Sequence, residues 1–141
     1  MTKEEWGYLF STRATDMSII SYVRCTVNDV NGYIVLPDNW PRNNYGFTSY
    51  NNAAIYYSTN QISLSDWTNR IEPYGALFLP VTGYREGTSV NKANTNGDYW
   101  SSSSIDGNNA SHVMFSDDTG KSNHDWTRKT GMAVRLVKTV E

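Results

Sequence analysis

The last part of the chain constrains the fold most, because it alternates short β-prone runs with polar turn segments. Three runs are predicted strands: Asp98–Ser103, Ser111–Ser116 and Met132–Val137. Segments rich in Asn, Asp and Gly separate them: Ile105–Asn109, Asp117–Gly120 and Lys121–Thr130. Strands hold their neighbours in place, whereas loops carry adaptable side chains over a rigid scaffold. The pattern therefore favours a framework that presents a polar and aromatic binding face, and no reaction centre is evident in it.

The composition predicts one folded domain over residues 1–141. A chain of 141 residues is long enough to form one hydrophobic core without covalent cross-links. Aromatic residues make up 13% of the chain and charged residues 18%, whereas disordered chains combine high charge with few aromatics. The formal net charge is -2 and there is no basic run, so nucleic acid is not an expected partner.

The cysteine content and the hydropathy pattern exclude further classes. Cys25 is the only cysteine, so no intrachain disulfide can form, and we expect a small buried apolar residue there. The first residues are polar and contain no apolar signal-peptide segment. No apolar run approaches the length of a membrane span, so we expect no direct membrane insertion.

The N-terminal part predicts a helix followed by a hairpin. Thr2 and Glu5 form a capping box, and the apolar stripe that follows predicts a helix from about Lys3 to Arg13. The expected core residues of this helix are Trp6 and Phe10. Ser18–Asn28 is β-prone and leads into a turn at Asn28–Gly32, which contains an Asn-Gly pair. The returning strand is Tyr33–Leu36, ended by Pro37.

The middle of the chain is a long loop followed by a second helix. Two interpretations of Asp38–Asn60 stay open: a direct role in binding, or a loop packed on the core by its aromatics. Those aromatics are Trp40, Tyr45, Phe47 and Tyr50. Ser63 with Asp66 predicts a helix start, and Pro73 its end before a strand at Ala76–Leu79. The apolar face of this helix is expected to carry Leu64, Trp67 and Ile71.

These elements together predict an α+β fold, with two helices packed on short antiparallel strands joined by long loops. Alternation along the last strands then separates core positions from contact positions. The predicted core residues are Trp100, Val113, Phe115, Val134 and Leu136. The opposite face of Ser111–Ser116 carries His112, Met114 and Ser116. Arg135 lies in an apolar run, so we expect it to be buried and paired with a carboxylate or several carbonyls.

The chemistry-bearing residues do not assemble into a recognisable catalytic or metal pattern. A Ser/His/Asp site could be imagined from Ser101–Ser104, His124 and Asp125, but no nucleophile-elbow pattern is present. Asp117–Asp125 offers oxygen ligands without the spacing of an EF-hand loop. The two histidines, His112 and His124, have no second ligand at zinc-site spacing. We therefore expect no enzyme, no metal and no cofactor.

Four regions of the chain, in order, resemble a known family. They read TKEEWGYLFSTR from Thr2, VNDVNGYIVLPDNW from Val27, GALFLPVTGYREGTSV from Gly75, and GDYWSSS from Gly97 with GMAVRLVK from Gly131. These segments resemble C-type-lectin-fold variable proteins, which diversity-generating retroelements diversify in phages and gut Bacteroidales. The similar members belong to the formylglycine-generating-enzyme-like branch of that fold.

The resemblance implies a C-type lectin fold whose variable region covers about residues 91–137. It implies a ligand- or receptor-binding module for phage tropism or bacterial surface recognition, on a virion or a bacterial cell surface. The partner is then a protein or a glycan on a cell surface. Two alternatives stay open: a fixed-specificity glycan-binding or adhesion domain of the same fold and, less expected, an enzyme. The oxidases of this branch use a cysteine pair, which one cysteine cannot supply.

The implied ligand-binding residues match variable positions of the family or follow from strand alternation. They are Asn91, Asp98, Ser104, Asp106, Asn108, His112, Met114, Ser116, Asn123, His124, Asp125, Trp126, Lys129, Thr130 and Met132. Adenine replacement in Asn codons readily yields Asn, Asp, Ser and His, whereas the Met, Trp and Lys positions need a different codon. We expect one exposed surface to gather Asp98, His112, Met114, Asn123, His124, Asp125 and Trp126. Trp126 is the leading contact residue, because large aromatics dominate interface energy.

Overall fold

The computed structural model describes residues 1–14, 21–41, 43–50, 56–117 and 122–137, and only the backbone of Ala14, Ser122 and Asn123. Its elements form two helices and three small, mostly antiparallel sheets. The predicted α+β class is therefore confirmed.

The first helix, α1 (Lys3–Phe10), begins at the predicted capping box. The Thr2 hydroxyl oxygen accepts from the Glu5 amide at 3.1 Å, and the Glu5 carboxylate accepts from the Thr2 amide at 2.7 Å. Trp6 and Phe10 are both buried, as expected. The helix ends earlier than Arg13, and a 3-10 turn, η1 (Thr12–Ala14), follows it.

The predicted hairpin is present, and its turn occupies only the first two residues of the predicted segment Asn28–Gly32. Strands β1 (Tyr22–Val27) and β2 (Val30–Val35) are joined at Asn28 and Asp29, whose φ angles are 47° and 64°. These left-handed conformations suit a two-residue hairpin turn. The Asn-Gly pair lies inside β2 instead. A Cβ atom at Gly32 would lie 2.4 Å from the Phe78 ring and 2.5 Å from the Leu79 carbonyl oxygen, so the glycine serves close strand packing.

Two further strands complete the first sheet. β3 (Gln61–Ile62), which follows the 3-10 turn η3 (Tyr57–Thr59), pairs parallel to β1. β4 (Leu77–Pro80) pairs antiparallel to β2, which gives the order β3-β1-β2-β4.

The second helical region starts at the predicted cap, where the Ser63 hydroxyl accepts from the Asp66 amide at 3.0 Å. It consists of α2 (Leu64–Asp66), the π-helical η4 (Trp67–Ile71) and the 3-10 turn η5 (Glu72–Tyr74). Pro73 lies within η5 and does not end the region, which closes at Gly75 with φ of 87°. Leu64 is 54% exposed while Ile71 is fully buried, so the predicted apolar face is wrong at its first position. The wider π-helical turn explains this, because it breaks the 3.6-residue spacing.

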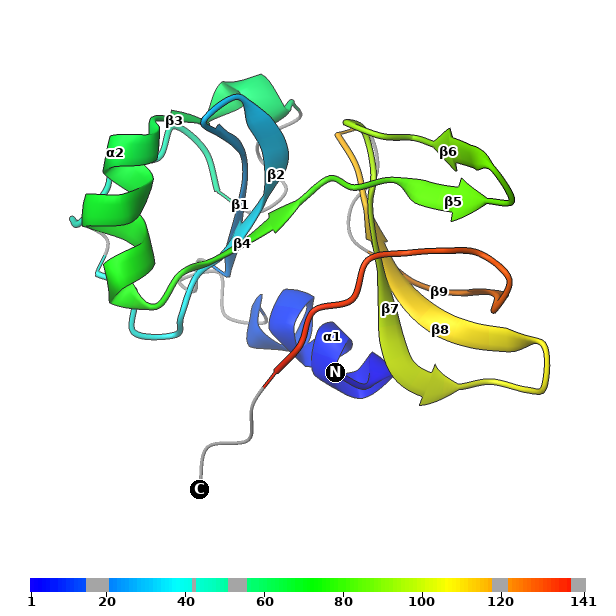
Figure 1. Cartoon of the computed structure of the whole chain (residues 1–141). Helices are drawn as coiled ribbons and strands as arrows, with labels where there is room; N and C mark the ends of the chain where they lie inside the picture. Colours follow the sequence, from blue (N-terminus) through cyan, green and yellow to red (C-terminus); the bar gives the residue numbers. More distant parts are fainter. Residues whose placement is uncertain (15–20, 42, 51–55, 118–121, 138–141) are drawn as a thin grey trace.

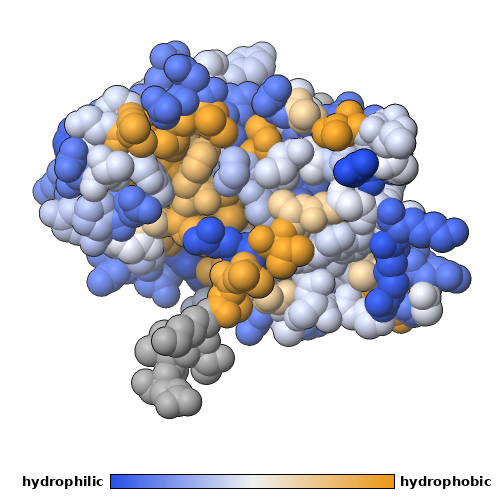
Figure 2. Space-filling view, in the orientation of Figure 1, coloured by the Kyte–Doolittle hydropathy of each residue, from blue (hydrophilic) through white to orange (hydrophobic). Residues whose placement is uncertain are grey.

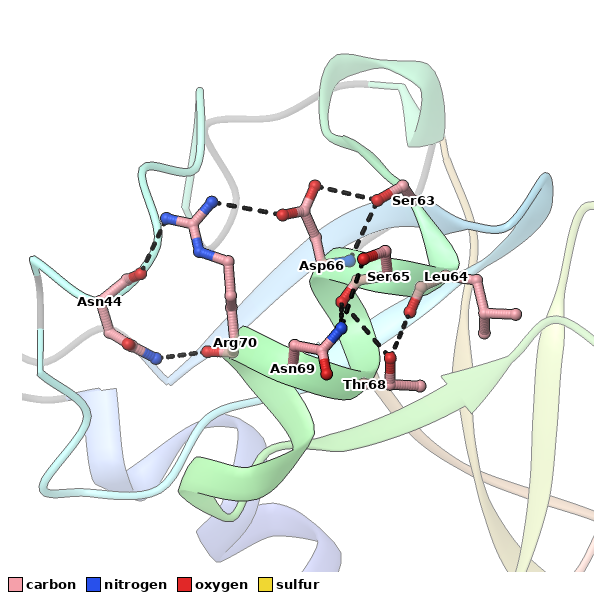
Figure 3. A network of polar contacts seen from close by, with 8 residues as sticks. All are labelled: Asn44, Ser63, Leu64, Ser65, Asp66, Thr68, Asn69 and Arg70. Atoms are coloured by element: carbon pink, nitrogen blue, oxygen red, sulfur yellow. Dashed lines mark hydrogen bonds and ion pairs between the residues drawn. The ribbon is translucent and has the colours of Figure 1, made fainter.

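A polar network fixes this helical region to the preceding loop (Figure 3). Arg70 forms an ion pair with Asp66 at 3.2 Å and donates to the Asn44 carbonyl at 3.2 Å. The Asn44 side chain donates back to the Arg70 carbonyl.

The long loop at Asp38–Asn60 packs on the core over its described residues. Trp40 and Phe47 are buried in the second cluster given below, and Tyr45 and Tyr50 pack against it. The packing interpretation is therefore confirmed for these residues. The side-chain oxygen of Asn60 accepts a hydrogen bond from the Thr48 amide at 2.8 Å, so Asn60 fixes the backbone of the loop.

The remaining strands form two sheets. β5 (Tyr84–Glu86) and β6 (Ser89–Asn91) form a hairpin. β7 (Gly97–Ser104), β8 (Asn109–Phe115) and β9 (Ser122–Thr127) form an antiparallel sheet in the order β7-β8-β9. Figure 1 shows β5 to β9 on one side of the molecule, the first sheet with α2 on the other, and α1 below both.

The third strand of this sheet corrects the sequence prediction. Ser122–Thr127, expected to be a loop, pairs with β8, whereas the predicted strand Met132–Val137 makes only an isolated bridge at Ala133. Val134 is 63% exposed, Leu136 is 86% exposed, and Arg135 is also exposed, so the predicted burial of all three is wrong. The segment leaves the sheet after Ala133, and Figure 2 shows hydrophobic surface where it approaches the grey trace.

The outer edge of β7 pairs with both ends of the described chain. The Ser102 amide donates to the Met1 carbonyl at 2.8 Å, and the Trp100 amide donates to the Ala133 carbonyl at 2.9 Å. The Ala133 amide in turn donates to the Asp98 carbonyl at 3.1 Å.

Two clusters of buried side chains form the core. The first joins α1 to the two larger sheets and contains Trp6, Phe10, Tyr22, Tyr33, Val35, Tyr57, Leu79, Val81, Tyr99, Val113 and Phe115. The second joins β1 and β2 to the helical region and contains Val23, Cys25, Val27, Ile34, Leu36, Trp40, Phe47, Ile62, Ile71 and Ala76. The predicted burial of Phe115 and Cys25 is confirmed. Trp100 is only half-buried, because Tyr99 takes the core-facing position of β7.

Arg135 is exposed, whereas Arg24 on β1 is buried. Its guanidinium donates to the Tyr33 hydroxyl at 2.6 Å and 3.0 Å, and to the Asp117 carbonyl at 2.8 Å. Arg24 therefore has the partners that a buried arginine needs.

Candidate binding site

The outer face of the β7-β8-β9 sheet carries the candidate site. In the register, Asp98 lies opposite Met114, and His112 lies between Trp100 and His124. Trp126 lies opposite Ala110, two residues along β9 from His124. Side chains at every second position share a face, so these residues project away from the core-facing Val113 and Phe115.

A cavity of about 210 Å³ opens on this face. Its two buried lining residues are Asp98 and His112. Its half-buried lining residues are Tyr84, Asn96, Met114 and Met132. Its exposed lining residues are Lys92, His124 and Trp126. The arrangement is concave and largely aromatic or thioether-lined, with polar groups at its inner end, as small-molecule and side-chain pockets usually are.

The imidazole of His112 is surrounded by aromatic rings. Its ring centroid lies 5.8 Å from Trp100, 5.8 Å from His124 and 6.1 Å from Trp126. Trp126 also meets Tyr84 of β5 at 6.2 Å, so two sheets contribute to one aromatic wall. Trp126 stays 41% exposed and is therefore available to a ligand.

Asp98 and His112 are each 2% exposed, and Asp98 Oδ1 lies 3.7 Å from His112 Nε2. Burial raises the pKa of Asp98 to about 6, against the opposing charge effect of His124. Burial, together with the neighbouring His124, lowers the pKa of His112 to about 4. At neutral pH the pair is therefore a carboxylate beside a neutral imidazole. Among the described residues, neither Asp98 Oδ2 nor His112 Nδ1 has a hydrogen-bond partner.

The structure brings six of the sequence-predicted site residues to this cavity and places the others elsewhere. The six are Asp98, His112, Met114, His124, Trp126 and Met132. Asp98 and His112 are buried at its inner end, which corrects the expectation that they are exposed. Asp125 points to the α1 side, where its carboxylate lies 3.6 Å from the Lys3 ammonium. The expected single surface therefore excludes Asp125, and the side chain of Asn123 lies outside the described residues.

The other predicted site residues lie apart from the cavity. Ser104, Asp106 and Asn108 are exposed around the β7–β8 turn, where Arg128 donates to the Ser104 hydroxyl and to the Asp106 carbonyl at 3.1 Å. Asn91, on β6, donates to Glu86 at 3.2 Å. Three further positions follow β8 or β9: Ser116 and Thr130, which are buried, and Lys129, which is exposed.

Sequence reasoning missed three lining residues: Tyr84, Lys92 and Asn96. Tyr84 lies on a different hairpin, and no periodicity relates it to β8 or β9. Lys92 and Asn94 have φ angles of 56° and 68°, so a tight turn brings this segment over the cavity. The dense Asn, Thr and Gly content around this turn was the available signal.

The alternative chemistries gain no support from the described residues. Ser101 donates its hydroxyl to the Ser111 carbonyl at 2.8 Å, and His124 and Asp125 lie on opposite faces of β9. The described residues contain no group of three or more His, Cys, Asp or Glu side chains that could hold a metal ion. Within the same ranges, no helix is long and apolar enough to cross a membrane.

Comparisons of the chain with protein-family models, curated proteins and solved structures find no match.

Proposed function

We propose that this protein is a binding module whose ligand enters the cavity on the outer face of the β7-β8-β9 sheet. The observation that supports this proposal best is that one face of that sheet packs in the core while the other face opens on the cavity. Val113 and Phe115 pack in the core, while Trp126 stays exposed over a cavity. Rigid aromatic anchors beside small polar groups are typical of adaptable binding surfaces. The proposal assigns the protein no catalytic role.

The more specific proposal is a C-type-lectin-fold variable protein that recognises a protein or glycan on a cell surface, on a virion or a bacterium. Its support is the order of the four resembling segments along the chain and the α+β architecture. A further support is that every cavity-lining residue except Tyr84 falls within residues 91–137, the proposed variable region.

One observation favours the alternative, a fixed-specificity glycan-binding or adhesion domain. Asp98 and His112 match variable positions of the family, yet both are buried. Buried positions tolerate fewer replacements than exposed ones, because burying a new polar or charged group without a hydrogen-bond partner is costly. If Asp98 and His112 cannot be replaced freely, this part of the site stays the same, as expected for a domain of fixed specificity.

Binding of the purified domain to a panel of bacterial cells and to a glycan array tests the proposal. The informative variant is Trp126→Ala, and its matched control is Tyr56→Ala, another exposed aromatic outside the cavity. We expect the first change to abolish binding to any cell or glycan that the wild type binds, and the second to leave it unchanged. Equal binding by Trp126→Ala and the wild type would contradict the proposed site.

The gene's surroundings separate the two binding hypotheses. A nearby non-coding repeat that differs from this gene only at adenines, beside a reverse-transcriptase gene, is expected for a diversified protein. A fixed-specificity domain has neither.

A further inference from the structure

We propose that the cavity selects a ligand that carries an alkylammonium group, such as the side chain of a lysine on a protein partner, with Asp98 as its counter-ion. This inference rests on the proposed function and deepens it by naming the chemistry of the ligand.

The first argument is a buried carboxylate without a fixed cation. Asp98 is 2% exposed, and its nearest basic partner among the described ion pairs is His112, 3.7 Å away. That imidazole is neutral at neutral pH, because burial lowers its pKa to about 4. A buried anion without a paired cation is unfavourable. A cationic ligand would compensate it, whereas a neutral ligand would leave the charge in place.

The second argument is that the unpartnered carboxylate oxygen of Asp98 requires a hydrogen-bond donor. Asp98 Oδ2 and His112 Nδ1 are buried and have no hydrogen-bond partner among the described residues. A carboxylate oxygen only accepts hydrogen bonds, so the group that approaches it must donate. An ammonium provides several donors and a positive charge, and such charge-assisted hydrogen bonds are the stronger kind.

The third argument is the chemistry of the walls. Trp126 and Tyr84 meet at 6.2 Å, and the thioethers of Met114 and Met132 line the same cavity. Aromatic faces attract cations, and indole does so most strongly. The aliphatic stem of a lysine side chain fits the apolar part of these walls, as lysine stems usually lie along apolar surface.

The size of the cavity limits the ligand. Its volume of about 210 Å³ lies below the range of roughly 300–1,000 Å³ that is usual for drug-sized ligands. One side chain of a larger partner therefore suits it better than a complete oligosaccharide. Lys92, which also lines the cavity, is exposed and forms no ion pair with Asp98 in the described structure.

The test uses two probes that differ in the ammonium group, Nα-acetyl-lysine methylamide and Nα-acetyl-norleucine methylamide. Each is titrated into the full chain while backbone amide NMR shifts are followed at pH 7.5. We expect the lysine probe to bind about tenfold more tightly than the norleucine probe. Equal dissociation constants for the two probes would overturn the inference.

Two variants separate charge recognition from general effects. Asp98→Asn keeps the shape of the side chain and is expected to remove the preference for lysine. Asp125→Asn removes an exposed carboxylate on the opposite face and is expected to keep it. If Asp98→Asn retains the preference, Asp98 is not the counter-ion and the inference is wrong.

A pH series on the wild type gives a readout that does not depend on a variant folding. The titratable groups that line the cavity with Asp98 are His112 on β8, His124 on β9, Tyr84 on β5 and Lys92 after β6. Because Asp98 has a pKa of about 6, lysine-probe affinity should fall about tenfold between pH 7.5 and pH 5. Positive charge gained by His112, whose pKa is lowered to about 4, acts in the same direction. An affinity that stays constant over this range would contradict the inference.

Failure here is distinguishable from failure of the proposed function. If binding to cells or glycans depends on Trp126 but the lysine probe neither binds nor competes, only the ammonium inference fails. If the Trp126→Ala variant binds like the wild type, the proposed site itself fails.

Discussion

Replacing Asp98 by asparagine should change how the stability of this protein depends on pH. The carboxyl group has a pKa of about 6 in the folded protein, against an ordinary value of 3.8. The folded state therefore holds this proton more tightly than the unfolded chain. In the wild type, the contribution of Asp98 to the free energy of unfolding is highest below about pH 4. It falls as the pH rises to about 6 and stays low above that. Asparagine has no such titration.

The size of the effect follows from the pKa shift. One pKa unit corresponds to about 1.4 kcal/mol, so the full shift corresponds to about 3 kcal/mol. The cavity is open to water, which screens part of this. We therefore expect the free energy of unfolding of Asp98→Asn, minus that of the wild type, to rise by about 1–3 kcal/mol from pH 4 to pH 7.

His112 provides a test of opposite sign. Its pKa is lowered from 6.5 to about 4, so the folded state binds this proton less tightly than the unfolded chain. Its contribution to stability is lost below about pH 4 and grows as the pH rises to about 6.5. The two contributions largely cancel in the wild type. His112→Gln, relative to the wild type, should therefore lose stability as the pH rises over the same interval.

Urea unfolding followed by tryptophan fluorescence at several pH values from 4 to 7 measures both differences. Subtracting the wild-type values removes the contribution of the groups that the variants leave unchanged. Asp125→Asn is the control, because that carboxylate is exposed. A pH-independent difference for Asp98→Asn, or changes of the same sign for the two cavity variants, would refute the reasoning.

Three further predictions concern the rest of the fold. Phe115→Ala should cost about 3–5 kcal/mol in urea unfolding, because Phe115 is fully buried, whereas Leu136→Ala should change stability by less than about 0.5 kcal/mol. Similar values for the two variants would contradict the assignment of the core. Gly32→Ala should cost about 1–3 kcal/mol, because its Cβ atom would overlap the Phe78 ring, and an unchanged urea midpoint would count against that packing. Adding a chelator should leave the thermal unfolding midpoint unchanged, since the described residues contain no group of three or more His, Cys, Asp or Glu side chains that could hold a metal ion; a large decrease would contradict this.

The elements that sequence predicted well are those with local causes. The capping box of α1 and the cap at Ser63 involve residues three positions apart, so their spacing is visible in the sequence. The burial of Val113 and Phe115 follows from alternation within one strand. Each of these predictions needed no knowledge of which segment packs against which.

The elements that sequence mispredicted depend on distant partners. β9 is polar on both faces and gives no alternating hydrophobic signal, yet it pairs with β8 along its length. The apolar run after Gly131 has stronger β-propensity but finds only a bridge at Ala133, because strand formation depends on the partner more than on propensity. The candidate site has the same origin: Tyr84 reaches it from another hairpin, and the burial of Asp98 results from the assembled sheet.

The outer edge of β7 is held by main-chain hydrogen bonds, which limits how side-chain replacements can affect the β7-β8-β9 sheet. The bonds at Met1, Trp100, Ser102 and Ala133 join main-chain atoms only, so no side-chain replacement except one to proline removes them. That edge is occupied and is not a template for pairing with another molecule. Replacements at exposed positions of β8 and β9 therefore leave these main-chain bonds in place, so the side chains on the outer face of the sheet can change while its backbone frame is kept.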